Sequence, residues 1–98
     1  MEMRDARAGL GRETAETLAI DALGYIAGDP ETLGRFLAAS GLGPATLRRA
    51  ASDPHFLAGV LDFMLSDETL LLAFAGHANI EAEAIAKARR AFGGTEDQ

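Results

Sequence analysis

Two aspartates interrupt apolar runs of the sequence, where a carboxylate could act as a general acid or base. Asp21 and Asp62 each stand between large apolar residues. A carboxylate that is buried requires a hydrogen-bonding or cationic partner, and Arg35 or Arg48 can supply one. We therefore interpret both aspartates as members of structural ion pairs, or of a narrow solvated helix face, rather than as catalytic groups.

The histidines and serines are spaced unlike those of a metal site or a nucleophilic centre. His55 and His77, the only two histidines, are 22 residues apart, whereas metal sites need several converging ligands, often two histidines one helical turn apart. Ser40, Ser52 and Ser66 fall at the ends of predicted helices, where hydroxyls ordinarily cap the backbone. We therefore expect no metal, no cofactor and no catalytic residue. An enzyme without a recognisable motif is the third-ranked hypothesis for the function.

The stretch 36–50 has the order of a helix-turn-helix motif. A helix is followed by Gly41, an apolar residue and a second helix that carries Arg48 and Arg49, and Arg35 directly precedes the stretch. In such a motif the second helix enters the major groove, and its arginines contact guanine or phosphate. DNA binding through Arg35, Arg48 and Arg49 is therefore the alternative hypothesis for the function.

Several features weaken the DNA-binding interpretation. Leu37 occupies a position where helix packing in such a motif favours a small residue, and Pro44 begins a short second helix. A plain helical corner explains the pattern equally well. The formal net charge of −6 and the isoelectric point of about 4.7 also disfavour nucleic acid as a partner, because DNA-binding domains usually present excess positive charge.

The elements that position these residues are all predicted to be helices. Asp29-Pro30 and Asp53-Pro54 are strong start signals, because aspartate caps the first turn and proline at the first helical position loses no hydrogen bond. Apolar residues at helical spacing follow each start, and no stretch alternates over the length of a strand. The predicted helices span 14–27, 30–39, 44–51, 54–65, 67–76 and 80–92.

Length and composition predict one all-α domain, a compact bundle of five or six short helices with 54–65 at its centre. The chain has 98 residues, of which 48% are hydrophobic, enough for a single core. We expect a disordered segment over 1–12, the helical domain over 13–92 and a flexible tail over 93–98.

The sequence also predicts a soluble, cytoplasmic protein without a membrane segment. The longest stretches without a charged residue, 36–47 and 69–80, are shorter than the roughly 20 residues of a membrane-spanning helix. The N-terminus has no apolar signal-peptide core. The chain contains no cysteine, which suits a reducing compartment.

A protein-interaction or accessory module acting through a helical surface is the leading hypothesis for the function. Phe63 and Leu72 lie off the main apolar faces of their predicted helices. They form either part of a central helical hairpin or an exposed patch that contacts another protein or a second copy of the chain. Under the interaction hypothesis, Phe63 and Leu72 are the predicted protein contacts.

Two runs that occur together, Leu18–Pro30 and Phe56–Leu65, resemble a known family, with Leu33–Leu37 between them and Asp67-Glu68 after them. The chain is similar on these residues to a small bacterial family, found mainly in alphaproteobacteria and described as a domain of unknown function. The resemblance covers roughly residues 14–92. It implies kinship over nearly the whole helical domain, but no activity and no site residues.

Overall fold

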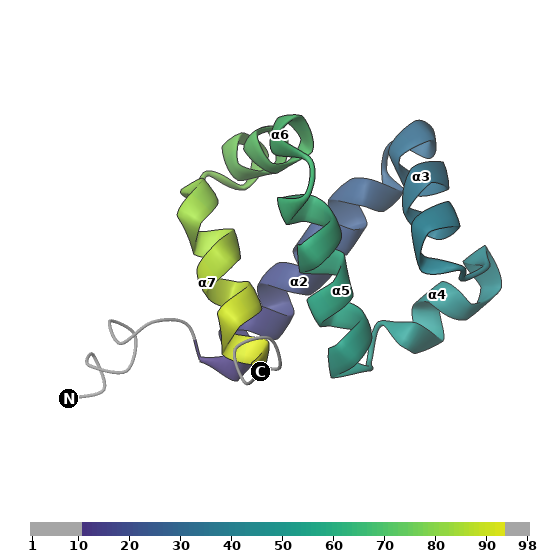
Figure 1. Ribbon diagram of the computed structural model, residues 1–98, viewed down its shortest axis with the longest axis horizontal. Coiled ribbons are helices and arrows are strands. Elements are labelled where there is room, and N and C mark those ends of the chain that lie inside the picture. The colour runs from purple at the N-terminus through teal and green to yellow at the C-terminus, as the bar shows by residue number, and fades with distance from the viewer. Residues whose placement is uncertain (1–10, 94–98) are drawn as a thin grey trace.

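Six α-helices and no strand make up the described part of the chain, residues 11–93, in a computed structural model (Figure 1). The prediction of an all-α domain is therefore confirmed. Each helix begins and ends within two residues of its predicted bounds, and the predicted disorder of 1–12 and 93–98 falls mostly outside the described residues. The helices are α2 (Arg12–Ala27), α3 (Pro30–Ser40), α4 (Pro44–Ala50), α5 (Pro54–Leu65), α6 (Glu68–Ala78) and α7 (Ala82–Phe92).

Aspartate caps begin three of these helices, two of them as the sequence predicts from an Asp-Pro pair. Each capping carboxylate accepts a hydrogen bond from a backbone amide in the first turn, which would otherwise lack a partner. Asp29 accepts from the Thr32 amide at 3.2 Å, Asp53 from the His55 amide at 3.0 Å, and Asp67 from the Leu70 amide at 3.2 Å. These caps fix where α3, α5 and α6 start.

The core lies where α2, α5 and α7 pack against one another (Figure 1). α2 contributes mainly small side chains to this contact, so the two other helices approach its backbone closely, and larger side chains of α5 and α7 fill the remaining space. The fully buried residues are Ala15, Ala19, Ala22 and Ile26 of α2, Val60, Leu61 and Met64 of α5, and Ile85 and Ala88 of α7. α5 is central, as predicted, and shares that position with α2.

The remaining helices attach to this core in different ways. α6 crosses one end of the core and buries Leu70 and Phe74. α3 inserts Phe36, which is almost fully buried, whereas α4 buries no residue completely and packs through the half-buried Leu47. No helix within residues 11–93 has both the length and the apolar character needed to cross a bilayer.

Two leucines provide a matched test of this core. Leu61 is fully buried in α5, whereas Leu72 in α6 is 54% exposed. We expect Leu61→Ala to lower the free energy of unfolding by about 2–5 kcal/mol, because it leaves a cavity, and Leu72→Ala to change it by less than about 0.5 kcal/mol. Urea denaturation followed by circular dichroism measures both values. Equal effects of the two substitutions would contradict the described core.

Candidate functional site

The two predicted protein contacts, Phe63 and Leu72, lie in different surroundings. Phe63 is half-buried and packs edge-to-face on Phe36 of α3, with 5.1 Å between ring centroids. Leu72 is two residues from both Leu70 and Phe74, which are buried, so it points away from the core on the outer side of α6. Phe63 therefore belongs to a concave part of the surface, whereas Leu72 protrudes.

Three phenylalanines form an apolar pocket between α3 and α5, which we call the phenylalanine pocket. It has a volume of about 340 Å³. The ring of Phe36 meets Phe56 at 5.8 Å and Phe63 at 5.1 Å between centroids, edge-to-face in both cases, the geometry in which aromatic rings attract one another. The pocket is lined by Phe36, Ala39, Ser40, Phe56, Gly59, Asp62 and Phe63. Its walls are thus held in place by the buried Phe36 before any ligand binds.

Arg35 stands between the phenylalanine pocket and a second, more polar groove. Its guanidinium carbon lies 5.8 Å from the centre of the Phe63 ring, a cation–π arrangement. The same guanidinium donates through Nη1 to Oδ2 of Asp67 at 3.2 Å. The side chain remains half exposed, so it is available to a partner that covers this region.

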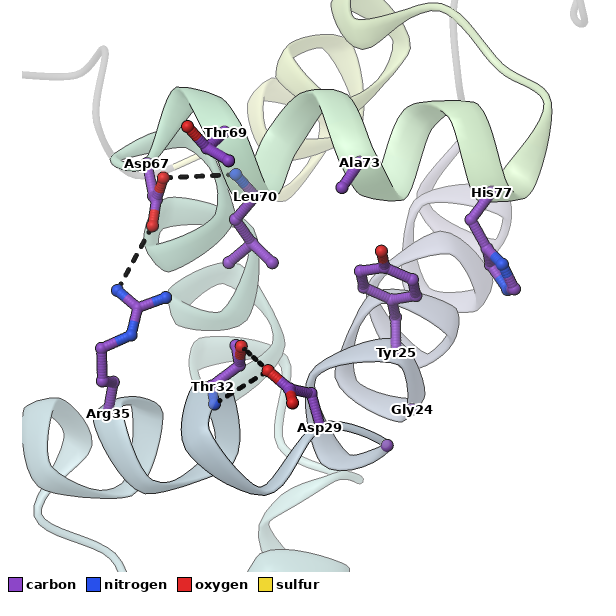
Figure 2. A pocket seen from close by; sticks show the side chains of 11 residues that line it. Gly24, Tyr25, Asp29, Thr32, Arg35, Asp67, Thr69, Leu70, Ala73 and His77 are labelled. Carbon is purple, nitrogen blue, oxygen red and sulfur yellow. Dashed lines mark hydrogen bonds and ion pairs between the residues drawn. The ribbon is translucent and has the colours of Figure 1, made fainter.

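The second groove, which we call the polar groove, runs between α2, α3 and α6 (Figure 2). Its volume is about 540 Å³. At one end Arg35 reaches from α3 to Asp67 at the start of α6, and at the other Tyr25 projects from α2 toward α6. The ring of Tyr25 lies 5.0 Å from that of His77 and 5.4 Å from that of Phe74. The groove therefore has an ion pair at one end and an aromatic pair at the other.

The carboxylates of the polar groove already have partners within the chain. Asp29 caps α3 and also accepts from the hydroxyl of Thr32. The pKa of Asp67 is lowered from its ordinary value of 3.8, chiefly by the hydrogen bond from the Leu70 amide. Burial opposes this lowering, and the hydrogen bond and charge of Arg35 add smaller contributions in the same direction as Leu70. Asp67 is thus both the cap of α6 and the ion-pair partner of Arg35, and Asp29 is the cap of α3.

The aspartates Asp21 and Asp62 are both at the surface. Asp21 is exposed on α2. Asp62 accepts a hydrogen bond of 2.7 Å from Nε of Arg89, which also donates to the carbonyl of Gly93 at 2.9 Å. The structural interpretation of Asp62 agrees with this ion pair, but the expected partner was wrong, because Arg89 of α7 reaches Asp62, whereas Arg35 pairs with Asp67.

The three arginines predicted for DNA binding do not share one environment. Arg48 and Arg49 are exposed in the last turn of α4, whereas Arg35 faces α6 and pairs with Asp67. Two of the three therefore lie together, and the third is engaged at the polar groove.

The histidines are separated in the fold as in the sequence. His55 is exposed in the first turn of α5, and His77 is exposed near the end of α6 beside Tyr25. Among residues 11–93, no three histidine, cysteine or carboxylate side chains gather in a way that could hold a metal ion.

Sequence reasoning identified Phe63 but missed the other walls of the phenylalanine pocket. Phe36, Phe56 and Gly59 were not among the predicted contacts. Phe56 and Phe63 are seven residues apart and therefore share a helix face, which was an available signal. Their meeting with Phe36 depends on how α3 crosses α5, which the spacing along the chain does not encode.

Comparison with known proteins places the chain in a family. The family model described as "Protein of unknown function (DUF3572)" matches residues 12–95. No curated protein and no solved structure shows a significant match to the chain.

Asp67 provides a pH-dependent test of the polar groove. Asp67→Asn keeps an oxygen that can accept from the Leu70 amide but removes the negative charge. Because the folded-state pKa lies below 3.8, the carboxylate stabilises the fold above its unfolded-state pKa, and this contribution is lost as the pH falls through the lowered value. We expect the variant to be less stable than the wild type near neutrality, and the difference to disappear on acidification.

Thermal unfolding of both proteins between neutral pH and about pH 2, below the ordinary range of carboxyl pKa values, measures this difference. Comparison of the two proteins cancels the titration of the other carboxylates. A stability difference that does not change with pH would show that the Asp67 charge makes no contribution.

Proposed function

Since the chain belongs to this family of unknown function, we propose a role from its surface alone: it is a protein-interaction module that binds a partner protein at the phenylalanine pocket. The observation that carries the proposal is the convergence of Phe36, Phe56 and Phe63 on a preformed apolar recess between α3 and α5. We also propose that this interaction takes place in the cytoplasm, as the sequence predicts, of a bacterial cell, as the family resemblance implies.

The size and lining of the pocket favour an apolar side chain of a protein as its occupant. A recess of about 340 Å³ can take one large aliphatic or aromatic residue, and such anchors in preformed pockets supply much of the energy of protein interfaces. Charged groups flank the aromatic walls, with Asp62 at the rim and Arg35 on the ring of Phe63. An apolar centre with a charged rim is the usual composition of a protein-binding surface.

The form of the pocket favours a partner helix. Its walls are two helices, α3 and α5, and a helix laid across them would direct one apolar side chain into the recess. The small residues Ala39 and Gly59 line the opening, one on each wall, so the partner backbone can approach both helices. The polar groove is less suited to catalysis than its residue types suggest, because Asp29 and Asp67 are held by caps and Arg35 by its ion pair.

Two substitutions that fill the pocket from opposite walls test the proposal. The space beside Gly59 is open, with no atom within 4 Å of the position that a Cβ would take, so Gly59→Leu adds a side chain at the rim without disturbing the core. Ala39→Leu does the same from α3. Gly34→Leu is the matched control, because Gly34 is an exposed glycine of α3 with the same free space and does not line the pocket.

We expect the wild type and Gly34→Leu to capture the same stoichiometric protein partner from a native lysate, with or without nuclease. With the purified partner, both pocket-filling variants are expected to bind at least about tenfold more weakly, equivalent to about 1.4 kcal/mol. Leu72→Ala in the same assay tests the second predicted contact. Undiminished binding by both pocket-filling variants would contradict the proposal, and recovery of nuclease-sensitive nucleic acid would favour the DNA-binding alternative through Arg48 and Arg49.

A further inference from the structure

The outer face of α2 carries an exposed isoleucine beside an open glycine. Ile20 is 48% exposed. Among residues 11–93, Ile20 and Leu72 are the two large apolar residues that are exposed. Gly24 follows one helical turn later, is exposed, and has no atom within 4 Å of the position that a Cβ would take. The surface of α2 thus offers a projecting apolar side chain and, on the same face, a point where its backbone is accessible.

Two grooves flank this face, one on either side of the line from Ile20 to Gly24. The groove on the α4 side has a volume of about 580 Å³ and is lined by Leu23, Leu47 and Ala51 among others. The groove on the α6 side has a volume of about 440 Å³ and includes Phe74 and Ala78. Ile20 and Gly24 line both grooves. A helix laid along α2 would therefore meet apolar side chains on both of its sides, together with Tyr25 and His77 on the α6 side.

Opposite charges stand on the two sides of the same face. Arg48 lines the groove on the α4 side, and Asp21 lines the groove on the α6 side. Both side chains belong to exposed residues, and neither forms an ion pair with another residue of the described range 11–93. The face is therefore positive on one flank and negative on the other.

We propose that this face binds a second copy of the chain, in a two-fold symmetric dimer whose α2 helices pack side by side at Gly24. The two-fold axis of this dimer runs parallel to the two α2 helices and passes between them. It therefore brings the α4 flank of each copy opposite the α6 flank of the other. Arg48 of each copy then faces Asp21 of the other, which makes two equivalent ion pairs. The same axis brings the two Ile20 side chains against each other, one helical turn from Gly24.

Self-complementarity is the reason to assign a second copy rather than a different protein. In a two-fold interface one surface must supply both members of every contact. This face carries the projecting Ile20 and the accessible backbone at Gly24, and it carries both Arg48 and Asp21. Gly24 also allows the close approach, because a side chain at this position would stand between the two helices.

Leu72 and Gly76 of α6 repeat the spacing of Ile20 and Gly24, with Leu72 exposed and the space beside Gly76 open. Neither residue lines any of the described grooves. The α2 face differs from this similar pattern because Ile20 and Gly24 line two grooves. The α2 face also shares no residue with the phenylalanine pocket, so dimer formation and partner binding can be tested separately.

Sedimentation equilibrium of the full chain over a wide concentration range tests the dimer. We expect the wild type to form a dimer and Gly24→Leu to remain a monomer, with circular dichroism showing that the variant is folded. Gly34→Leu, at an equally open exposed glycine of α3, is the matched control and is expected to dimerise like the wild type. A monomeric wild type at every concentration, or a Gly24→Leu variant that still dimerises, would overturn the proposal.

Charge reversal tests the arrangement of the two copies. We expect Asp21→Arg and Arg48→Asp each to raise the dimer dissociation constant on the order of tenfold, because each introduces two like-charge contacts. The double variant Asp21→Arg/Arg48→Asp restores both ion pairs with the charges exchanged and is expected to dimerise nearly as well as the wild type. A double variant no better than the single ones, or loss of the dimer in Leu72→Glu instead, would show that the copies do not meet in this way.

Discussion

The close approach of α2 to α5 and α7 depends on small side chains at their contact. Ala15, Ala19 and Ala22 place no more than a methyl group between the α2 backbone and its neighbours, and all three are fully buried. Larger residues there would force the helices apart, since interiors are packed to near crystal density. α2, the longest of the described helices, packs against α3, α5 and α7, so its position constrains theirs. The cation–π contact of Arg12 with Phe92, at 5.2 Å, joins the start of α2 to the end of α7.

The positions of the peripheral helices α3 and α6 depend on this packing, and these helices form the phenylalanine pocket and the polar groove with the core helices. α3 leaves the end of α2 after the short turn at Gly28-Asp29 and inserts Phe36 between two rings of α5. α6 crosses the same end of the core, so its first turn comes within reach of α3, and the Arg35–Asp67 pair spans the gap. The phenylalanine pocket and the polar groove therefore arise from one arrangement, and Arg35 contacts both.

The helices could be predicted from the sequence because their determinants are local. The pairs Asp29-Pro30 and Asp53-Pro54 each signal a helix start within two residues of sequence. The helix that follows the second pair, α5, has the predicted bounds. The tertiary partners could not be predicted, because they depend on how helices cross. Asp62 was expected to pair with Arg35 or Arg48, yet Arg35 meets Asp67 and Arg89 meets Asp62. Each of those ion pairs joins residues about 30 positions apart, on different helices. Spacing along the chain does not predict how two such helices are oriented relative to each other.

Surface residues that do not stabilise the fold through contacts within the chain are the most informative about function. Apolar burial explains Leu61, and capping explains Asp29, Asp53 and Asp67, so these residues stabilise the fold whatever the protein binds.

A glycine inside a helix costs roughly 0.5–1 kcal/mol of stability relative to alanine, and neither Gly24 nor Gly59 is required by any neighbouring atom of its own chain. An open glycine alone proves little, since Gly34 and Gly76 are equally free. Gly24 and Gly59 differ from these two because each lines an apolar recess with charged residues at its rim, where a second backbone could come close. The two proposed interfaces, one on α2 and one between α3 and α5, both depend on the packing of α2 against α3 and α5, which the buried alanines of α2 help to set.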